Sequence, residues 1–188
     1  MEVLTQTELR LRLDEVIDKI KKGALFIHPT DTIYGIGCNA LNASSVEKIR
    51  RLKERPTSPF SVWVPSLGWI QENCQVNKEG KHWINRLPGP LTLLLPLKNK
   101  KAIASNVIPG LSTIGIRHPN HWFIKVIKKC GVPIITTSAN KSDSPFMTKI
   151  ENLDSDIEKE VDFMIYEGEK KARPSKIINT TDDKIIER

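Results

Sequence analysis

The chain has 188 residues, of which 39% are hydrophobic, and this is enough to bury the core of one domain, which we expect to span residues 1–188. Lysine and arginine outnumber aspartate and glutamate by 29 to 22, and the charge of +7 favours either a polyanionic partner or a merely lysine-rich surface. No apolar run is long enough to cross a bilayer and the N-terminus lacks a secretory signal, so we expect a cytoplasmic protein without a membrane partner. The three cysteines are widely spaced, which argues against a disulfide framework and a zinc site.

The order of the expected elements indicates an α/β fold. Thr5 and Glu8 form a capping-box pattern before apolar residues at helical spacing, which predicts one helix up to Gly23, and a short strand over 24–28 follows. The later elements are expected to be a helix capped by Ser44 that ends before Pro56, a strand over 60–64, helices over 65–73 and 78–87, strands over 91–97 and 112–117, a helix over 122–131, a strand over 132–136, a charged helix over 149–160, and strands over 163–166, 176–179 and 184–186. Helices and strands alternate for most of the chain but not at its end, so we expect a mixed sheet with helices packed on it.

Polar residues gather where the expected strand over 24–28 ends. The segment Pro29–Gly37 places two threonines, an aspartate and a tyrosine ahead of two glycines, so hydroxyl groups lie where backbone can approach a ligand closely. A β-turn in which the aspartate and the threonines bond to their own backbone would use the same residues, and that alternative stays open for the segment alone.

Three further clusters resemble this one in composition. Together the four clusters combine cations with hydroxyl groups and an amide and hold few carboxylates: Thr30–Tyr34, Lys53 with Arg55, Thr113 with Arg117, and Thr136–Asn140. Guanidinium forks and short hydroxyls match anionic oxygens, so the set suits phosphate and carboxylate groups. Cations at a helix C-terminus also complement the helix dipole, and Ser138 with Asn140 also suits a helix cap.

Common catalytic patterns are missing from the sequence. It contains no P-loop, no dinucleotide fingerprint, no nucleophile elbow and no H-E-x-x-H pattern. The pair His118 and His121 has a proline between its members and no further ligand nearby, so we expect no metal held there. With these patterns excluded, the sequence favours a mechanism that relies on positioning the reactants and stabilising charge.

Five motifs, taken in order, resemble those of the YrdC-type L-threonylcarbamoyladenylate synthases. They are Pro29–Gly37, Lys53–Pro56, Pro88–Thr92, Ile116–Pro119 and Thr137–Asn140. The resemblance implies a twisted α/β sheet whose concave basic face holds the site. It also implies a nucleotidyltransferase that converts L-threonine, bicarbonate or CO2, and ATP into threonylcarbamoyl-AMP and pyrophosphate, for the threonylcarbamoyl modification of adenosine next to the anticodon in tRNA.

The resemblance further implies roles for single residues. L-Threonine is expected to contact Thr32, Arg117, Thr136 and Ser175, with Arg117 on its carboxylate. ATP is expected to contact Lys53, Arg55, Thr113, Ser138, Asn140 and Arg188, and the catalytic residues are expected to be Lys53 and Arg55. For Arg188 a frayed terminus is the structural alternative. Mg2+ is expected to arrive with the triphosphate, and further expected partners are tRNA and the downstream tRNA threonylcarbamoyl transferase machinery.

Two departures fall on the threonine side of the motifs. Trp63 stands where many members have a histidine that contacts threonine, and Lys176 replaces the threonine of the P-S-T-I pattern. Two rival functions stay open. One is a non-catalytic module that binds tRNA or ribosomal RNA through a basic face. The other is carbamoyl transfer as in hydrogenase maturation, which belongs to longer chains with zinc fingers and an acylphosphatase unit.

Overall fold

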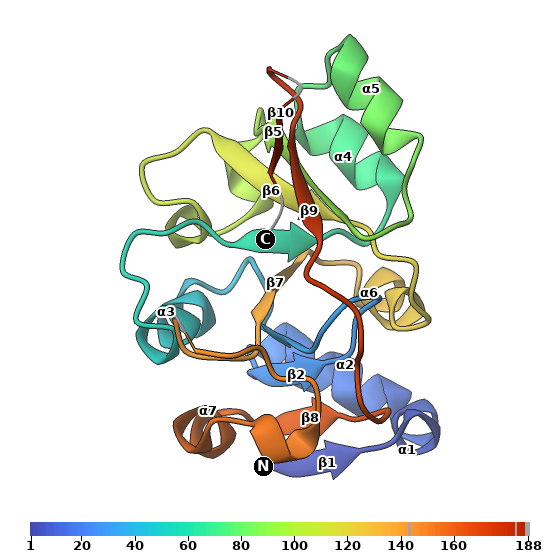
Figure 1. Cartoon of the computed structure of the whole chain (residues 1–188), viewed down its shortest axis with the longest axis vertical. Coiled ribbons are helices and arrows are strands. Elements are labelled where there is room, and N and C mark those ends of the chain that lie inside the picture. The colour runs from blue at the N-terminus through green and yellow to red at the C-terminus, as the bar shows by residue number, and fades with distance from the viewer. Residues whose placement is uncertain (143, 183, 187–188) are drawn as a thin grey trace.

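The computed structural model describes residues 1–142, 144–182 and 184–186. These residues form a sheet of ten strands in the order β1-β8-β2-β3-β7-β4-β6-β5-β9-β10 (Figure 1). The strands are β1 (Glu2–Leu4), β2 (Phe26–His28), β3 (Gly35–Gly37), β4 (Ser61–Trp63), β5 (Leu91–Pro96), β6 (Thr113–Arg117), β7 (Ile134–Ser138), β8 (Phe163–Ile165), β9 (Lys176–Asn179) and β10 (Lys184–Ile186).

The sheet is mixed, as the sequence predicts. Strand β8 runs parallel to both β1 and β2, and the pairs β4/β6 and β5/β9 are also parallel. The pairs β2/β3, β3/β7, β4/β7, β5/β6 and β9/β10 are antiparallel. The short hairpin of β2 and β3 and the later strand β7 thereby bring polar segments far apart in sequence to neighbouring positions.

Helices bury two apolar cores against this sheet. The helices are α1 (Gln6–Leu11), α2 (Leu13–Lys22), α3 (Ala43–Leu52), α4 (Leu67–Asn73), α5 (Lys78–Ile84), α6 (Ile124–Cys130) and α7 (Ser155–Glu160), with short 3-10 turns η1 (Lys100–Ala102), η2 (Ser105–Val107) and η3 (Ile150–Asn152). Apolar residues of α1, α2 and α6 pack with β1, β2 and β8 in one core, and the other core runs from α3 and α7 to α4 and α5.

Several helix ends follow the expected local chemistry. Thr5 accepts a hydrogen bond from the Glu8 backbone while the Glu8 carboxylate accepts one from the Thr5 backbone, so the capping box is present. Gly23 and Gly131 end α2 and α6 in the left-handed conformation that glycine adopts most easily.

Other local expectations are wrong. The expected single helix up to Gly23 is divided at Arg12, whose guanidinium bonds to carboxylates on both sides of it, Glu2 and Glu15. Asn42 caps α3 in place of Ser44, because its side chain reaches the Ser45 backbone N–H at 3.1 Å. The charged segment 149–160 forms a 3-10 turn and a separate short helix.

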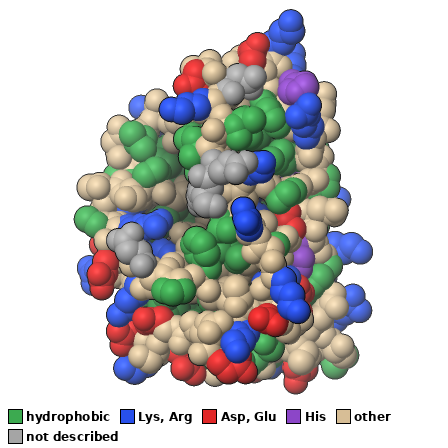
Figure 2. All heavy atoms as spheres, in the orientation of Figure 1, with side chains coloured by type: hydrophobic (Ala, Val, Ile, Leu, Met, Phe, Trp, Pro, Cys, Tyr) green, Lys and Arg blue, Asp and Glu red, His purple; other side chains and the backbone are tan. Residues whose placement is uncertain are grey.

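One long connection crosses the sheet. Residues 166–175, here called the strap, lead from β8 to β9 and run in front of the sheet in Figure 1. Figure 2 shows lysine and arginine side chains spread over the same face, with acidic side chains along its lower edge and a few near its top and sides. Among the described residues, no helix is long and apolar enough to cross a membrane.

Candidate active site

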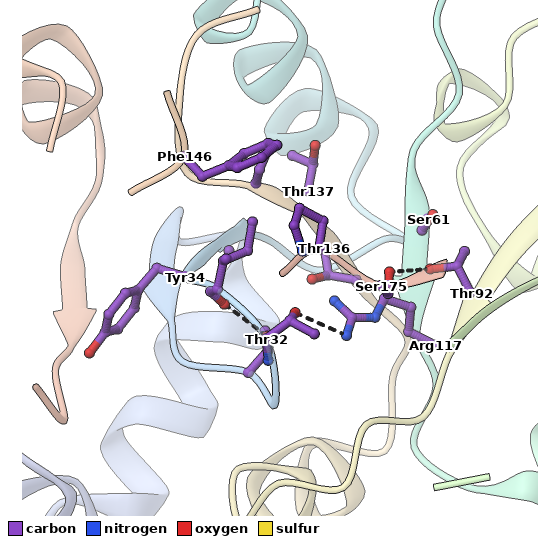
Figure 3. A pocket seen from close by; sticks show the side chains of 14 residues that line it. Thr32, Tyr34, Ser61, Thr92, Arg117, Thr136, Thr137, Phe146 and Ser175 are labelled. Atoms are coloured by element: carbon purple, nitrogen blue, oxygen red, sulfur yellow. Dashed lines mark hydrogen bonds between the residues drawn. The ribbon is translucent and has the colours of Figure 1, made fainter. Parts of the chain in front are cut away.

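A polar pocket lies where the strap meets the middle of the sheet. It is lined by residues of β3, β4, β5, β6 and β7, of the loop before β3, of the loop after β7 and of the end of the strap (Figure 3). Its hydroxyl groups come from Thr30, Thr32, Tyr34, Ser61, Thr92, Thr136, Thr137, Ser138 and Ser175. Arg117 is the charged residue among the lining residues that the structure describes.

Missing side chains in two strands make room for this pocket. A Cβ atom on Gly115 would lie 2.5 Å from Ser61 Oγ and 3.3 Å from a Thr92 methyl carbon, so only glycine lets these side chains approach each other. A Cβ atom on Gly35 would lie 3.2 Å from Thr136 Oγ1 and 3.0 Å from the His28 ring. The pocket floor therefore depends on bare backbone in β3 and β6.

Arg117 ends β6 and projects its guanidinium between the site loop 29–34 and the hydroxyl groups of β7 and the strap (Figure 3). Its Nη2 donates to Asp31 Oδ1 at 2.8 Å and lies 3.5 Å from Thr32 Oγ1. The arginine is only 8% exposed, so this cation is largely shielded from water. A cation so placed can bind an anionic ligand group strongly.

Pairs of hydroxyl groups surround Arg117. Thr30 and Thr32 contact each other through their side-chain oxygens at 2.9 Å, and Thr92 and Ser175 do the same at 2.8 Å. Thr30 also donates to the carbonyl of Ile33, which holds the site loop in its turn. The threonines of this loop therefore bond to their own backbone, as in a turn, and also line the pocket.

The strap is held against the site loop by Tyr34 and Lys170. The Tyr34 hydroxyl donates to the Gly168 carbonyl at 2.6 Å and accepts from the Glu167 backbone at 3.1 Å, while Lys170 donates to the Thr30 carbonyl at 2.9 Å. Burial raises the pKa of Glu167, but hydrogen bonds from His121, Lys170 and Trp122 prevail and lower it to about 2. Glu167 is thus an ionised anchor at the base of the strap.

Lys53 is fully buried and lies behind the pocket. Its ammonium faces four oxygen atoms: the carbonyl oxygens of Ser138 and Asn140, Ser138 Oγ at 3.3 Å and Asn140 Oδ1 at 3.0 Å. Burial, together with the nearby Arg55 charge, lowers the pKa of Lys53 to about 7. This group of contacts, here called the lysine knot, joins the end of α3 to the end of β7.

The backbone after α3 explains the different directions of Lys53 and Arg55. Glu54 has a positive φ of 52°, and the Arg55 N–H returns to the Arg50 carbonyl at 3.0 Å, which closes the helix with a Schellman turn. Lys53 is directed at β7, whereas Arg55 stays half-buried and donates through Nε to Ser142 Oγ at 3.0 Å. The side chain of Lys53 therefore binds β7 rather than the carbonyl groups of its own helix.

Of the other residues expected to contact ATP, those that the structure describes lie at different distances from the pocket. Ser138 lines the pocket, and Asn140 lies next to it in the lysine knot. Thr113 begins β6, opposite Pro96, and does not line the pocket that holds Arg117 at the other end of the strand. Arg188 lies outside the described residues. No helix begins at Ser138–Asn140 in the described chain, so the helix-cap alternative is wrong.

An aromatic group supports the pocket floor from below. Trp63 is fully buried, and its ring lies 5.4 Å from that of His28 and 5.7 Å from that of Phe123. Nδ1 of His28 lies 3.2 Å from the Pro29 carbonyl, and burial lowers the pKa of His28 to about 3. Trp63 thus belongs to the core and does not line the pocket.

The structure brings the four expected threonine contacts together. Thr32, Arg117, Thr136 and Ser175 all line one pocket (Figure 3). The sequence reasoning missed other lining residues: Ser61, Thr92, Thr137 and Phe146. Thr92 and Thr137 lie inside motifs that the sequence analysis singles out, so the motifs contained that signal, whereas nothing local marks Ser61 or Phe146.

The described residues contain no group of three or more histidine, cysteine, aspartate or glutamate side chains that could hold a metal ion. His121 instead lies 2.9 Å from Glu167, within the anchor of the strap. The donor set present, hydroxyls and cations, does not fit a resident metal; a metal carried in by a nucleotide would rely on phosphate oxygens.

Comparisons with known proteins agree with this architecture. A family model for Sua5, YciO and YrdC, described as "Telomere recombination", matches residues 18–188. A putative threonylcarbamoyl-AMP synthase of Methanocaldococcus jannaschii is 38% identical over 186 residues, which cover 97% of this chain and 87% of that protein. A threonylcarbamoyl-AMP synthase of Bacillus subtilis is 34% identical over 143 residues, which cover 74% of this chain and 41% of that protein.

Solved structures share the fold. The crystal structure of P. abyssi Sua5 complexed with L-threonine superposes with a TM-score of 0.86 and 28% identity, covering 98% of this chain and 55% of that one. The chain therefore spans about half the length of that longer relative. E. coli YciO shares the fold with a TM-score of 0.83 at 22% identity, covering 99% of this chain and 92% of that one. With the family model matched over most of its length, the chain belongs to the Sua5/YciO/YrdC family.

Proposed function

We propose that this chain is an L-threonylcarbamoyladenylate synthase, a nucleotidyltransferase that makes threonylcarbamoyl-AMP and pyrophosphate from L-threonine, bicarbonate or CO2, and ATP. The observation that carries the proposal is the pocket in which Arg117 lies among the hydroxyl groups of Thr32, Thr136 and Ser175. The relatives named threonylcarbamoyl-AMP synthase and the threonine complex of P. abyssi Sua5 support the same proposal.

The pocket suits a small hydroxylated amino acid. A guanidinium can bind a carboxylate with two parallel hydrogen bonds, so Arg117 is the proposed partner of the threonine carboxylate. Thr32, Thr136 and Ser175 can donate to or accept from the threonine side-chain hydroxyl, because each hydroxyl has both capacities.

The nucleotide is proposed to extend from this pocket past the end of β7. Ser138 and Asn140 lie there, and Arg55 is half-buried near the same segment through Ser142. Arg55 is the proposed phosphate contact, whereas Lys53 in its present position would act by holding Ser138 and Asn140 in place. Thr113 and Arg188 stay proposed contacts that rest on the resemblance alone. Mg2+ would enter with the triphosphate and neutralise part of its charge.

The reaction needs alignment more than a protein nucleophile. The threonine amine takes up CO2, and a carbamate oxygen then attacks the α-phosphorus, so that pyrophosphate leaves with the electrons of the broken P–O bond. Effective catalysis then comes from holding the two reactants in line and from cations near the leaving oxygens. The product would pass to tRNA threonylcarbamoyl transferase machinery, and direct tRNA binding is a further proposal based on the net charge of +7.

One assay tests the proposal directly. Pyrophosphate release from ATP in bicarbonate buffer should require L-threonine, with serine and glycine as weak or inactive substitutes. Arg117→Ala should abolish the threonine-dependent pyrophosphate release while leaving the protein folded, as judged by thermal denaturation. Threonine-independent pyrophosphate release would refute the proposed reaction. No release from wild-type protein that binds RNA would favour the non-catalytic module instead.

A further inference from the structure

Asp31 is the acidic residue of the site loop, and its contacts are unusual for a surface carboxylate. Its Oδ1 accepts from Arg117 Nη2 at 2.8 Å, and its Oδ2 accepts from the Asn120 backbone at 3.2 Å. The side chains of Arg117 and Asp31 are 9% and 10% exposed, so the pair is one of the most shielded ion pairs in the described chain. Asp31 itself does not line the pocket, although its neighbours Thr30 and Thr32 do.

Two lysines near the pocket are held by protein contacts. Lys170, which contacts the Thr30 carbonyl, is paired with Glu167, and Glu167 also binds His121 and Trp122. Lys53 lies behind Ser138, bonded to protein oxygens. Arg117 is the charged residue among the described residues that line the pocket, and Asp31 provides a direct counter-charge to it.

We propose that Asp31 is a specificity-determining residue, which makes the pocket prefer a zwitterionic amino acid over a plain anion by neutralising Arg117. This inference rests on the proposed function of the pocket. A zwitterion adds no net charge to the shielded Arg117–Asp31 pair, whereas an anion of the same shape leaves one uncompensated negative charge in a poorly hydrated place. Without Asp31, Arg117 would lose the carboxylate that accepts from its Nη2, and the pocket would attract any small anion more strongly.

This selectivity has a use in the proposed reaction. ATP and pyrophosphate carry oxygens that a lone arginine would bind, and they would compete with the amino acid for its pocket. The Arg117–Asp31 pair would thus keep phosphate groups out of the pocket while it still binds a carboxylate that arrives with its own ammonium group.

The test compares two ligands of equal shape. One is L-threonine, and the other is its hydroxy-acid analogue, in which a hydroxyl replaces the amine and leaves a plain anion. Dissociation constants are measured by calorimetry on wild-type protein, on Asp31→Asn, which is nearly isosteric, and on Asp31→Glu, which keeps the charge. Asp14→Asn is the matched control, because Asp14 also pairs with a cation, Lys129 at 3.1 Å, but is 91% exposed and lies on α2.

We expect wild-type protein to prefer L-threonine by more than about tenfold, and Asp31→Asn to lose about tenfold of that preference, which corresponds to about 1.4 kcal/mol. The Asp31→Glu and Asp14→Asn proteins should keep the wild-type preference within about threefold. Pyrophosphate should also inhibit Asp31→Asn competitively with threonine, more strongly than wild type. A loss of stability alone, without a change in this preference, is what a merely structural role would give.

An unchanged preference in folded Asp31→Asn would overturn the inference. If that variant does not fold, wild-type protein decides by itself, since equal affinity for the two ligands would also overturn it. Selective threonine binding without pyrophosphate release would refute the proposed function and leave the role of Asp31 standing. Pyrophosphate release together with an unchanged preference would refute the role of Asp31 alone.

Discussion

Arg117 and Lys53 are both buried cations at the ends of regular elements, yet they occupy opposite kinds of environment. Arg117 ends β6 and faces a pocket whose other groups are mostly neutral hydroxyls. Lys53 ends α3 and directs its ammonium at four protein oxygens, so the lysine knot is internally satisfied. The comparison teaches that a cation within a motif can serve a ligand or the fold, and that its bonded partners distinguish the two.

The lysine knot should carry the largest effect on stability. Lys53→Met keeps the aliphatic stem but leaves buried oxygens without a donor, so the free energy of unfolding should fall by about 2–4 kcal/mol. Thermal denaturation should show this as a loss of about 5–15 °C. Lys22→Met on α2, where the lysine is exposed and paired with Asp18, should change stability by no more than about 0.5 kcal/mol. A stable Lys53→Met protein with weakened ATP binding would instead assign Lys53 to the ligand.

Arg55 should behave as the opposite of Lys53, although only one residue separates them. Arg55→Ala should weaken ATP binding by about 1.5–3 kcal/mol, because a charged hydrogen bond to phosphate is lost, while stability changes by about 0.5 kcal/mol or less. Arg51→Ala is the matched control, since Arg51 lies on α3, is exposed and pairs only with Glu47 among the contacts described. Unchanged ATP affinity in Arg55→Ala, measured by calorimetry, would contradict a nucleotide role.

Arg117→Lys tests whether the buried cation of the pocket binds the threonine carboxylate. The charge is kept, but an ammonium cannot form the two parallel hydrogen bonds of a guanidinium, so the KM for threonine should rise by about tenfold or more. The KM for ATP should stay within about twofold and serves as the internal control. A threonine KM within about twofold of wild type would remove Arg117 as the carboxylate partner.

The smallest expected effect is the dependence of stability on pH that the buried His28 causes. Because burial lowers its pKa from 6.5 to about 3, the folded protein binds fewer protons than the unfolded chain between these values. The contribution of His28 to the free energy of unfolding is therefore fully present above pH 6.5. It is lost as the pH falls towards 3, at up to about 1.4 kcal/mol per pH unit.

The measurement is urea denaturation of wild type and His28→Phe at several pH values between about 6.5 and 4.5. Wild type should lose stability more steeply than His28→Phe over this window, whereas His82→Phe, at an exposed position of α5, should follow the wild-type slope. Equal slopes for wild type and His28→Phe would show that the imidazole under the pocket floor is not held neutral.

Much of the architecture is determined by local sequence. The strands over 176–179 and 184–186 have the predicted bounds, the capping box at Thr5 is present, and Gly23 and Gly131 end their helices as expected. These features depend on neighbours within a few residues, where propensity and capping act. The alternation of helices and strands likewise predicts a mixed α/β sheet, and the clusters of polar residues at strand ends predict which segments carry the site.

Only the tertiary structure decides what each polar residue contacts. Strands β1 and β3 are three residues long and gain their stability from pairing with β8, β2 and β7, which no local pattern encodes. The same long-range pairing places Ser61 at the pocket and Trp63 in the core. Lys53 and Arg55 share one motif, but the turn at Glu54 and the position of β7 bury Lys53 against β7 and leave Arg55 half-buried and bonded to Ser142. Sequence thus determined the elements and the kinds of side chain, and long-range strand pairing determined their partners.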